Sequence, residues 1–160
     1  MPAAPRIAEI APADAPRDLL LLADPSPAKL ESYLPGARCF AADTGAAPVG
    51  ACAIVPLGPD VFELMSIAVS PDAQRRGIGT ALLRHAIAVL ASAGAKRLEV
   101  GTGSFGYQLA FYQRQGFRVE RVDRDFFVRT YPEPIVEDGI RLRDMLRLAL
   151  ELPSEPVRNP

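Results

Sequence analysis

The longest helical pattern in the chain covers residues 77–93, where apolar side chains recur every three or four positions. This spacing places the apolar side chains on one face of a helix, which can then pack against a core. The recurring positions are Ile78, Leu82, Ala86, Val89 and Leu90. Gly94 follows them, and glycine commonly ends a helix. We therefore predict an amphipathic helix over residues 77–93.

Shorter apolar and alternating runs predict the remaining elements. Predicted strands cover residues 7–10, 38–42, 49–55, 61–69, 97–100, 117–122 and 146–152. Predicted shorter helices cover residues 19–22, 28–34 and 109–115. Asp24 or Ser26 is placed to cap the helix over 28–34. Strands and helices in this order indicate an α/β (α+β) fold, with a mixed sheet and helices on its faces.

The prolines divide the chain into a central part and two flanks. The sequence has 160 residues, the size of one domain, and contains 16 prolines. None lies between Pro71 and Pro132. Because proline breaks helix interiors and central strands, the main regular structure is expected in this window. We predict one domain over residues 1–153, followed by a frayed tail over 154–160.

Charge and composition exclude several classes of function. The net charge is −1, which argues against nucleic-acid binding, since phosphates require clustered Lys and Arg. Cys39, Cys52 and His85 are the only cysteines and histidine, too few for a disulfide framework or a zinc cluster, and we expect no metal. No apolar run approaches the roughly 20 residues of a membrane span. Residues 1–16 do not resemble a signal peptide, so we expect a cytoplasmic protein.

The segment Q-R-R-G-I-G-T, residues 74–80, stands where a predicted strand and loop lead into the long helix. A helix N-terminus presents free N–H groups and a partial positive charge. Gly77 and Gly79 let an anion approach this backbone, Arg75 and Arg76 add positive charge, and Thr80 offers a hydroxyl. The segment therefore predicts a pyrophosphate site, although its glycines would also serve an ordinary turn. It is not a Walker loop, because no Gly-Lys-Ser/Thr follows.

A second glycine-rich segment offers a competing interpretation. Gly101, Gly103 and Gly106 form G-x-G-x-x-G between a predicted strand and a predicted helix, and Glu120 follows about 20 residues later. This matches a dinucleotide fingerprint and also resembles the loop of S-adenosylmethionine-dependent methyltransferases. Only 54 residues follow Gly106, too few for the βα units such a sheet needs. We keep the methyltransferase as an alternative.

Taken together, several motifs resemble the GNAT family, the Gcn5-related N-acetyltransferases. They are V-F-E-L-M-S-I-A-V-S-P, Q-R-R-G-I-G-T-A-L-L, R-L-E-V-G-T-G, F-Y-Q-R-Q-G-F and D-M-L-R-L-A-L, in the family's order over residues 61–152. The G-T-G loop and the D-F-F segment at 125–127 are most similar to small bacterial single-domain members. The resemblance implies a V-shaped sheet of six or seven strands, with acetyl-CoA entering between strands 61–69 and 97–100. It also implies an acetyl-CoA-dependent N-acyltransferase, which in this family is often a homodimer.

The resemblance also implies which residues hold acetyl-CoA. The pantetheine would pair with the backbone of the strand 61–69, and the pyrophosphate would lie on the segment 74–80. Relatives often carry Asn in the loop before the helix predicted over residues 109–115, where this chain has Ser104. The implied cofactor-binding residues are Ile67, Ala68, Val69, Gln74, Arg75, Arg76, Gly77, Ile78, Gly79, Thr80, Ser104 and Tyr107.

Attack of an amine on a thioester requires a base for the amine proton and an acid for the departing sulfur. Tyr112 lies in F-Y-x-x-x-G-F, where the family often has its general acid. Glu63 and Glu99 compete for the role of base. The resemblance implies Glu63 on the strand beside the acetyl group, where several members have their base, and Glu99 on the opposing strand, where other members have one. Strand alternation would place Glu63 on one face with Ile67. We prefer Glu63, because a base must be within reach of the amine. Either carboxylate could instead be a solvated or ion-paired residue of the sheet.

The flank before the last strand carries candidate acceptor-binding residues. Phe127 and Tyr131 could belong to the core or line an acceptor pocket, where Glu137 would favour cationic amines. The expected acceptor is a primary amine of a small molecule or a peptide, acetylated by direct transfer, because neither cysteine has a nucleophile setting. A non-catalytic acyl-CoA-binding protein of the same fold is a further alternative.

Overall fold

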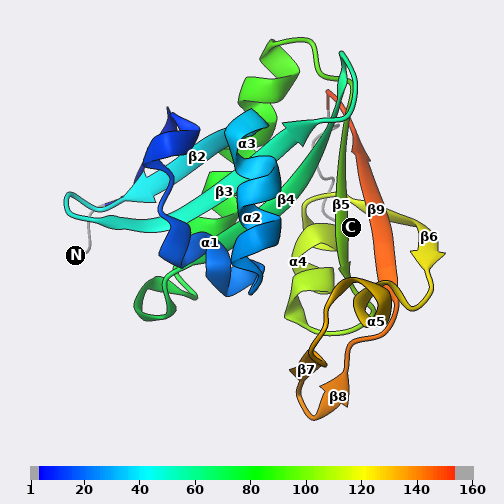
Figure 1. Cartoon of the computed structure of the whole chain (residues 1–160). Helices are drawn as coiled ribbons and strands as arrows, with labels where there is room; N and C mark the ends of the chain where they lie inside the picture. The colour runs from blue at the N-terminus through cyan, green and yellow to red at the C-terminus, as the bar shows by residue number, and fades with distance from the viewer. Residues whose placement is uncertain (1–3, 154–160) are drawn as a thin grey trace. The chain divides into compact units, whose positions relative to one another are not determined.

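The computed structural model describes residues 4–153, and its residues group into two compact units, 1–95 and 96–160. The predicted tail over residues 154–160 lies outside the described residues. The first unit contains β1 (Arg6–Ile10), η1 (Pro12–Asp14), α1 (Arg17–Ala23), α2 (Pro27–Tyr33), η2 (Leu34–Gly36), β2 (Arg38–Asp43), β3 (Pro48–Pro56), β4 (Val61–Val69), η3 (Pro71–Ala73) and α3 (Ile78–Ser92). Every strand and helix predicted in this part of the sequence is present (Figure 1).

Strands β1 to β4 form consecutive antiparallel pairs, and helices cover both faces of this sheet. One face packs against α1 and α2 through a core that includes Leu20, Leu30, Cys39 and Ala53. The opposite face meets α3, where the ring of Phe40 on β2 lies 5.9 Å from that of His85. His85 is therefore a packing residue here, as a half-buried histidine away from the predicted anion site would be.

Two helix ends follow the local rules that the sequence indicated. Ser26 caps α2, because its Oγ accepts a hydrogen bond of 3.2 Å from the Lys29 N–H. Asp24 instead accepts from the Ser26 N–H at 3.2 Å. After α3 the chain turns at Gly94, whose φ of +92° is a left-handed conformation that glycine adopts without strain.

The second unit contains β5 (Arg97–Gly103), α4 (Tyr107–Arg114), β6 (Arg118–Asp123), α5 (Phe126–Thr130), β7 (Val136–Glu137), β8 (Ile140–Arg141) and β9 (Met145–Glu151). β9 lies between β5 and β6 and is antiparallel to both. β5 runs three residues beyond the predicted end at Val100, so Gly101 and Gly103 are strand residues. Helix α5 and the small β7–β8 hairpin were not predicted (Figure 1).

Candidate active site

In the first unit, Glu63 lies on β4 beside a β-bulge. The register with β3 shifts there, so that Ala53 pairs with Ser66 while Ile54 pairs with Leu64, and Met65 is the extra residue. Glu63 pairs with Val55, and directly opposed residues of antiparallel strands point to the same face. Glu63 therefore shares the α1–α2 face with Ser66. The predicted alternation, which placed Glu63 with Ile67, is wrong because a bulge reverses the facing of the residues beyond it.

The residues around Glu63 on this face include a polar contact that the sequence did not predict. The Tyr33 hydroxyl of α2 donates a hydrogen bond of 3.2 Å to the Ser66 Oγ. Ser66 is only 4 % exposed, a rare degree of burial for a serine in a sheet. This bond satisfies the buried hydroxyl and joins α2 to β4.

The predicted anion site lies between β4 and α3. The side-chain amide of Gln74 donates to the Val69 carbonyl at 3.0 Å and so ties the loop to the end of β4. Arg75 and Gly77 both have left-handed backbones, with φ of 64° and 77°, and Gly77 is the N-cap of α3. A side chain at Gly77 would meet nothing within 4 Å, so the glycine serves the turn and leaves the helix start open.

The side chains of this loop match an anion site in part. Residues 74–77 are exposed, so both arginines are accessible to a phosphate. The 15-residue helix α3 begins at Ile78 without a side-chain cap, which leaves its first N–H groups for another acceptor. Ile78 itself is buried, at 4 % exposure, so only its backbone can face a ligand.

In the second unit, Tyr112 lies on α4 and is 7 % exposed. Its ring packs against Phe111 at 5.3 Å and against Phe117 at 5.7 Å, measured between ring centroids. These contacts fix the direction of the side chain, as a proton donor requires. At the start of α4, Tyr107 is 76 % exposed, and Ser104 in the preceding loop is also exposed.

Glu99 is an ion-paired residue of the sheet. Its carboxylate lies 3.5 Å from the Nε of Arg97 on β5 and 3.7 Å from Nη2 of Arg147 on β9. Arg97 also pairs with Glu120 of β6 and Glu151 of β9, which raises the pKa of its guanidinium, first through the Glu120 hydrogen bond. Glu99 thus belongs to a network that joins three strands, and two cations already occupy its oxygens.

The glycines of G-x-G-x-x-G serve side-chain packing and a turn. A Cβ at Gly101 would collide with the sulfur of Met145 and lie 2.9 Å from an Arg147 nitrogen. A Cβ at Gly103 would lie 2.9 Å from a Leu142 methyl group. Gly106 has a φ of +101° and is the N-cap of α4. Two glycines of the apparent fingerprint are therefore covered by protein side chains in β5.

Two of the three candidate acceptor residues in the second unit are in contact with each other. Phe127 of α5 and Tyr131, the residue after this helix, stack with ring centroids 6.1 Å apart, and Phe126 meets Phe127 edge-on at 5.3 Å. All three rings are half-buried, between a core and a surface position. The Glu137 Oε2 lies 3.9 Å from the place of a Cβ on Gly106, so its carboxylate stands beside the N-terminus of α4.

Asp144 holds the start of α5, a contact that the sequence does not indicate. Asp144 accepts a hydrogen bond of 2.9 Å from the backbone N–H of Asp125, which has a left-handed φ of 61°. The two residues are 19 positions apart, so no local capping pattern indicates this contact. The D-F-F segment alone gave no signal for a helix.

Both cysteines are buried and form no disulfide. Burial raises the pKa of the Cys52 thiol to about 12, and it also raises the pKa of Cys39. Neither thiol is therefore ionised near neutral pH, where a nucleophilic cysteine would need to be. Across residues 4–153, no group of three or more His, Cys, Asp or Glu side chains is arranged to hold a metal ion. In the same part of the chain, no helix is long and apolar enough to cross a membrane.

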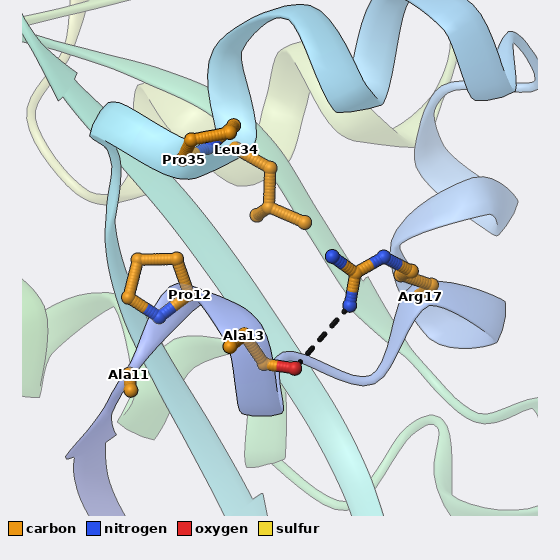
Figure 2. Close-up of a pocket in the computed structure, with 6 residues that line it drawn as sticks. All are labelled: Ala11, Pro12, Ala13, Arg17, Leu34 and Pro35. Atoms are coloured by element: carbon orange, nitrogen blue, oxygen red, sulfur yellow. Dashed lines mark hydrogen bonds between the residues drawn. The ribbon is translucent and has the colours of Figure 1, made fainter.

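A pocket of about 380 Å³ lies elsewhere in the first unit (Figure 2). Its lining residues are Ala11, Pro12, Ala13, Arg17, Leu34 and Pro35. The Arg17 guanidinium donates to Ala13 O at 3.4 Å and to Glu31 at 2.6 Å, so its charge is already compensated. None of the predicted site residues lines this pocket.

Comparisons with known proteins identify the class to which this arrangement belongs. A sequence model of the Acetyltransferase (GNAT) family matches residues 6–117. The uncharacterised N-acetyltransferase YvbK of Bacillus subtilis is 42% identical over 136 residues, which cover 84% of this chain and 88% of that protein. The chain therefore belongs to the GNAT family and is an acetyl-CoA-dependent N-acetyltransferase.

Solved structures agree in fold. An IAA acetyltransferase from Bacillus cereus has a TM-score of 0.89 and 41% identity, covering 93% of this chain and 100% of that one. A GNAT acetyltransferase from Elizabethkingia anophelis, with acetyl-CoA bound, has a TM-score of 0.87 and 37% identity, covering 92% and 98%. These matches confirm the predicted fold class. The methyltransferase alternative is wrong, because its fingerprint lies in an acetyltransferase and two of its three glycines, Gly101 and Gly103, are covered by side chains.

Proposed function

We propose that this enzyme moves the acetyl group of acetyl-CoA directly to a primary amine, on a small molecule or at an amino group of a peptide or protein. The observation that best supports cofactor binding is the uncapped N-terminus of α3, with Arg75 and Arg76 exposed beside it. Pyrophosphate fits such a helix start. The Elizabethkingia relative holds acetyl-CoA, and a Bacillus subtilis acetyltransferase 38% identical to this chain holds CoA.

In this proposal the backbone of β4 and the loop after it bind the cofactor. The pantetheine runs along Ile67, Ala68 and Val69, and the pyrophosphate lies on the residues from Gln74 to Thr80. Gln74 acts indirectly, because its amide is bonded to the Val69 carbonyl and so fixes the loop. Ser104 and Tyr107, both exposed before or at the start of α4, complete the proposed cofactor contacts.

We assign the base to Glu63 in preference to Glu99. The carboxylate of Glu99 is already shared by Arg97 and Arg147, so a proton arriving there would have to displace ion pairs. Glu63 is half-buried on the α1–α2 face of β4. A base must have an oxygen available to accept the amine proton. In Glu99 both oxygens are already engaged in ion pairs.

Tyr112 is the proposed general acid. The amine nitrogen forms a bond to the carbonyl carbon while the carbon–sulfur bond breaks. One proton of the amine passes to Glu63, and the Tyr112 hydroxyl gives a proton to the departing sulfur. No cysteine takes part, because burial holds Cys52 in its thiol form.

For the acceptor we propose only a chemical class, a primary amine. A [ribosomal protein bS18]-alanine N-acetyltransferase of Escherichia coli is 35% identical over 83 residues, which are 51% of this chain. That relative's acceptor makes a peptide amino group one candidate, and small amines are the other. Phe127, Tyr131 and Glu137 are the proposed acceptor-side residues, where aromatic rings and a carboxylate suit a cationic amine.

The two compact units are proposed to act as one acetyltransferase domain over residues 1–153. The family match supports this, since residues 6–117 include all of β1 to α3 and continue through α4. The unit boundary at residues 95–96 thus lies inside the matched segment.

An acceptor panel tests the proposed function. The protein is incubated with acetyl-CoA and either small primary amines or peptides with different amino termini, and free thiol release is followed. We expect turnover with one of these classes and none without acceptor. Binding of acetyl-CoA without turnover on any amine would overturn the proposal in favour of an acyl-CoA-binding protein.

A further inference from the structure

The segment 137–147, which begins with the acceptor-side residue Glu137, packs against the glycines of G-x-G-x-x-G. Going along β5 into the next loop, Gly101 meets Met145 and Arg147, Gly103 meets Leu142, and Gly106 meets Glu137. Each glycine thus faces a residue of the segment 137–147, in reverse chain order. The three absent side chains leave the space that this returning segment fills.

The contact at Gly103 is with a buried leucine. Leu142 is 6 % exposed, and one of its methyl carbons lies 2.9 Å from where a Cβ on Gly103 would be. The Leu142 N–H also donates to the Ile135 carbonyl at 2.8 Å, which closes the base of the β7–β8 hairpin. Any side chain at Gly103 would therefore force Leu142 to move.

The residues after Leu142 hold helix α5. The Arg143 carbonyl accepts from the Phe127 N–H at 3.0 Å, and the Asp144 carboxylate accepts from the Asp125 N–H at 2.9 Å. These two bonds fix the first turn of α5, which has only five residues and no capping bond from its own N-cap side chain. A helix this short depends on such tertiary contacts.

We propose that Leu142, seated on Gly103, is a positioning residue that sets the place of Phe127 and Tyr131 and thereby acceptor recognition. The inference rests on the proposed acceptor role of those two rings. In this proposal Leu142 acts on both rings indirectly. It acts through Arg143 and Asp144, because a shift of Leu142 moves the two acceptors that hold the start of α5.

Amide hydrogen exchange tests the positioning part without any acceptor. In Gly103→Ala we expect the Phe127 and Asp125 amides to exchange about tenfold faster, while the α3 amides keep their protection. Shortening the clashing side chain in Gly103→Ala/Leu142→Val should restore much of the lost protection. Gly36→Ala is the matched control, since a Cβ there meets nothing within 4 Å. Unchanged exchange at Phe127 and Asp125 in Gly103→Ala would overturn the inference.

Steady-state kinetics test the link to the acceptor. With the best acceptor from the panel, Gly103→Ala should raise KM for the acceptor several-fold and leave KM for acetyl-CoA unchanged. The double variant should recover the acceptor KM. If exchange at α5 rises while the acceptor KM stays constant, the recognition role is wrong although the acetyltransferase activity stands. If the unmodified protein shows no turnover with any acceptor, the proposed function itself is contradicted.

Discussion

The Tyr112 side chain joins a buried ring to a hydroxyl that the proposed chemistry uses. The ring is held between Phe111 and Phe117, so removing only the oxygen leaves its packing in place. We expect Tyr112→Phe to lower kcat by about 100-fold, the lower end of the effect of a general acid. KM for acetyl-CoA should change little, because the cofactor contacts proposed for β4 and α3 remain.

Thiol release under saturating acetyl-CoA measures this effect, and a thermal melt checks that the variant is folded. Phe111→Leu is a useful companion, since it disturbs the packing of Tyr112 but keeps the hydroxyl. Equal kcat in Tyr112→Phe and in the unmodified enzyme would remove Tyr112 from the acid role. A fall in stability without a fall in kcat would identify the tyrosine as a core residue.

Motifs in the sequence named the candidate site residues, but they did not indicate the face of the sheet to which each side chain points. F-Y-x-x-x-G-F indicated Tyr112, and the carboxylates of both strands indicated Glu63 and Glu99. The bulge at Met65 reversed the side to which Glu63 points, and no residue there signals an extra position. The ion pairs of Glu99 depend on Arg147, which is 48 residues away and is placed by the β5–β9 register.

At the scale of elements, prediction was accurate where local pattern sets the structure. Strand β4 has the bounds that its alternation predicted, and α3 differs by one residue at each end. Helix α5 was missed because Asp144 and Arg143, far along the chain, hold its first turn. β5 was predicted too short, because Gly101 and Gly103 suggested a loop but serve the packing of Met145 and Leu142.

The pairing of β1 with β2 carries a prediction about pH. The Arg38 guanidinium bonds both oxygens of Glu9, at 2.8 and 2.9 Å, and this hydrogen bonding lowers the pKa of Glu9 from its usual 4.5. A carboxyl group with a lowered pKa stabilises the fold at pH values above its unfolded pKa. That stabilisation is lost as pH falls through the folded pKa.

We expect Glu9→Gln to lower the free energy of unfolding by about 0.5 kcal/mol at pH 7, since water screens these partly exposed side chains. The difference should shrink as pH falls below 4.5 and vanish below the lowered pKa of folded Glu9, where this carboxyl group of the unmodified protein is protonated in both the folded and the unfolded state. Urea denaturation at both pH values measures it. The double variant with Arg38→Met isolates the pair, and a difference that persists at low pH would assign the effect to packing.

For the whole molecule, the order of motifs carried the identification better than any motif alone. The G-x-G-x-x-G fingerprint is as complete as the Q-R-R-G-I-G-T segment, but only the second leaves its glycine backbone uncovered at a helix start. Gly77 opens the start of a 15-residue helix, whereas Gly101 and Gly103 lie within a strand under neighbouring side chains. The spacing of glycines indicates where the backbone is accessible. Only the fold shows whether a ligand or another side chain of the protein occupies that space.

Thermal denaturation with and without ligand tests which of the two glycine-rich segments corresponds to a ligand site. Acetyl-CoA at about 100 times its Kd should add about 2.7 kcal/mol to the free energy of unfolding and raise Tm by roughly 5–10 °C. S-adenosylmethionine should give no shift. Arg76→Glu reverses one exposed charge beside α3, so we expect its own Tm to change little and its acetyl-CoA shift to fall by at least half. A shift that survives this reversal undiminished would place the pyrophosphate away from the start of α3, while the acetyltransferase family of the chain would stand.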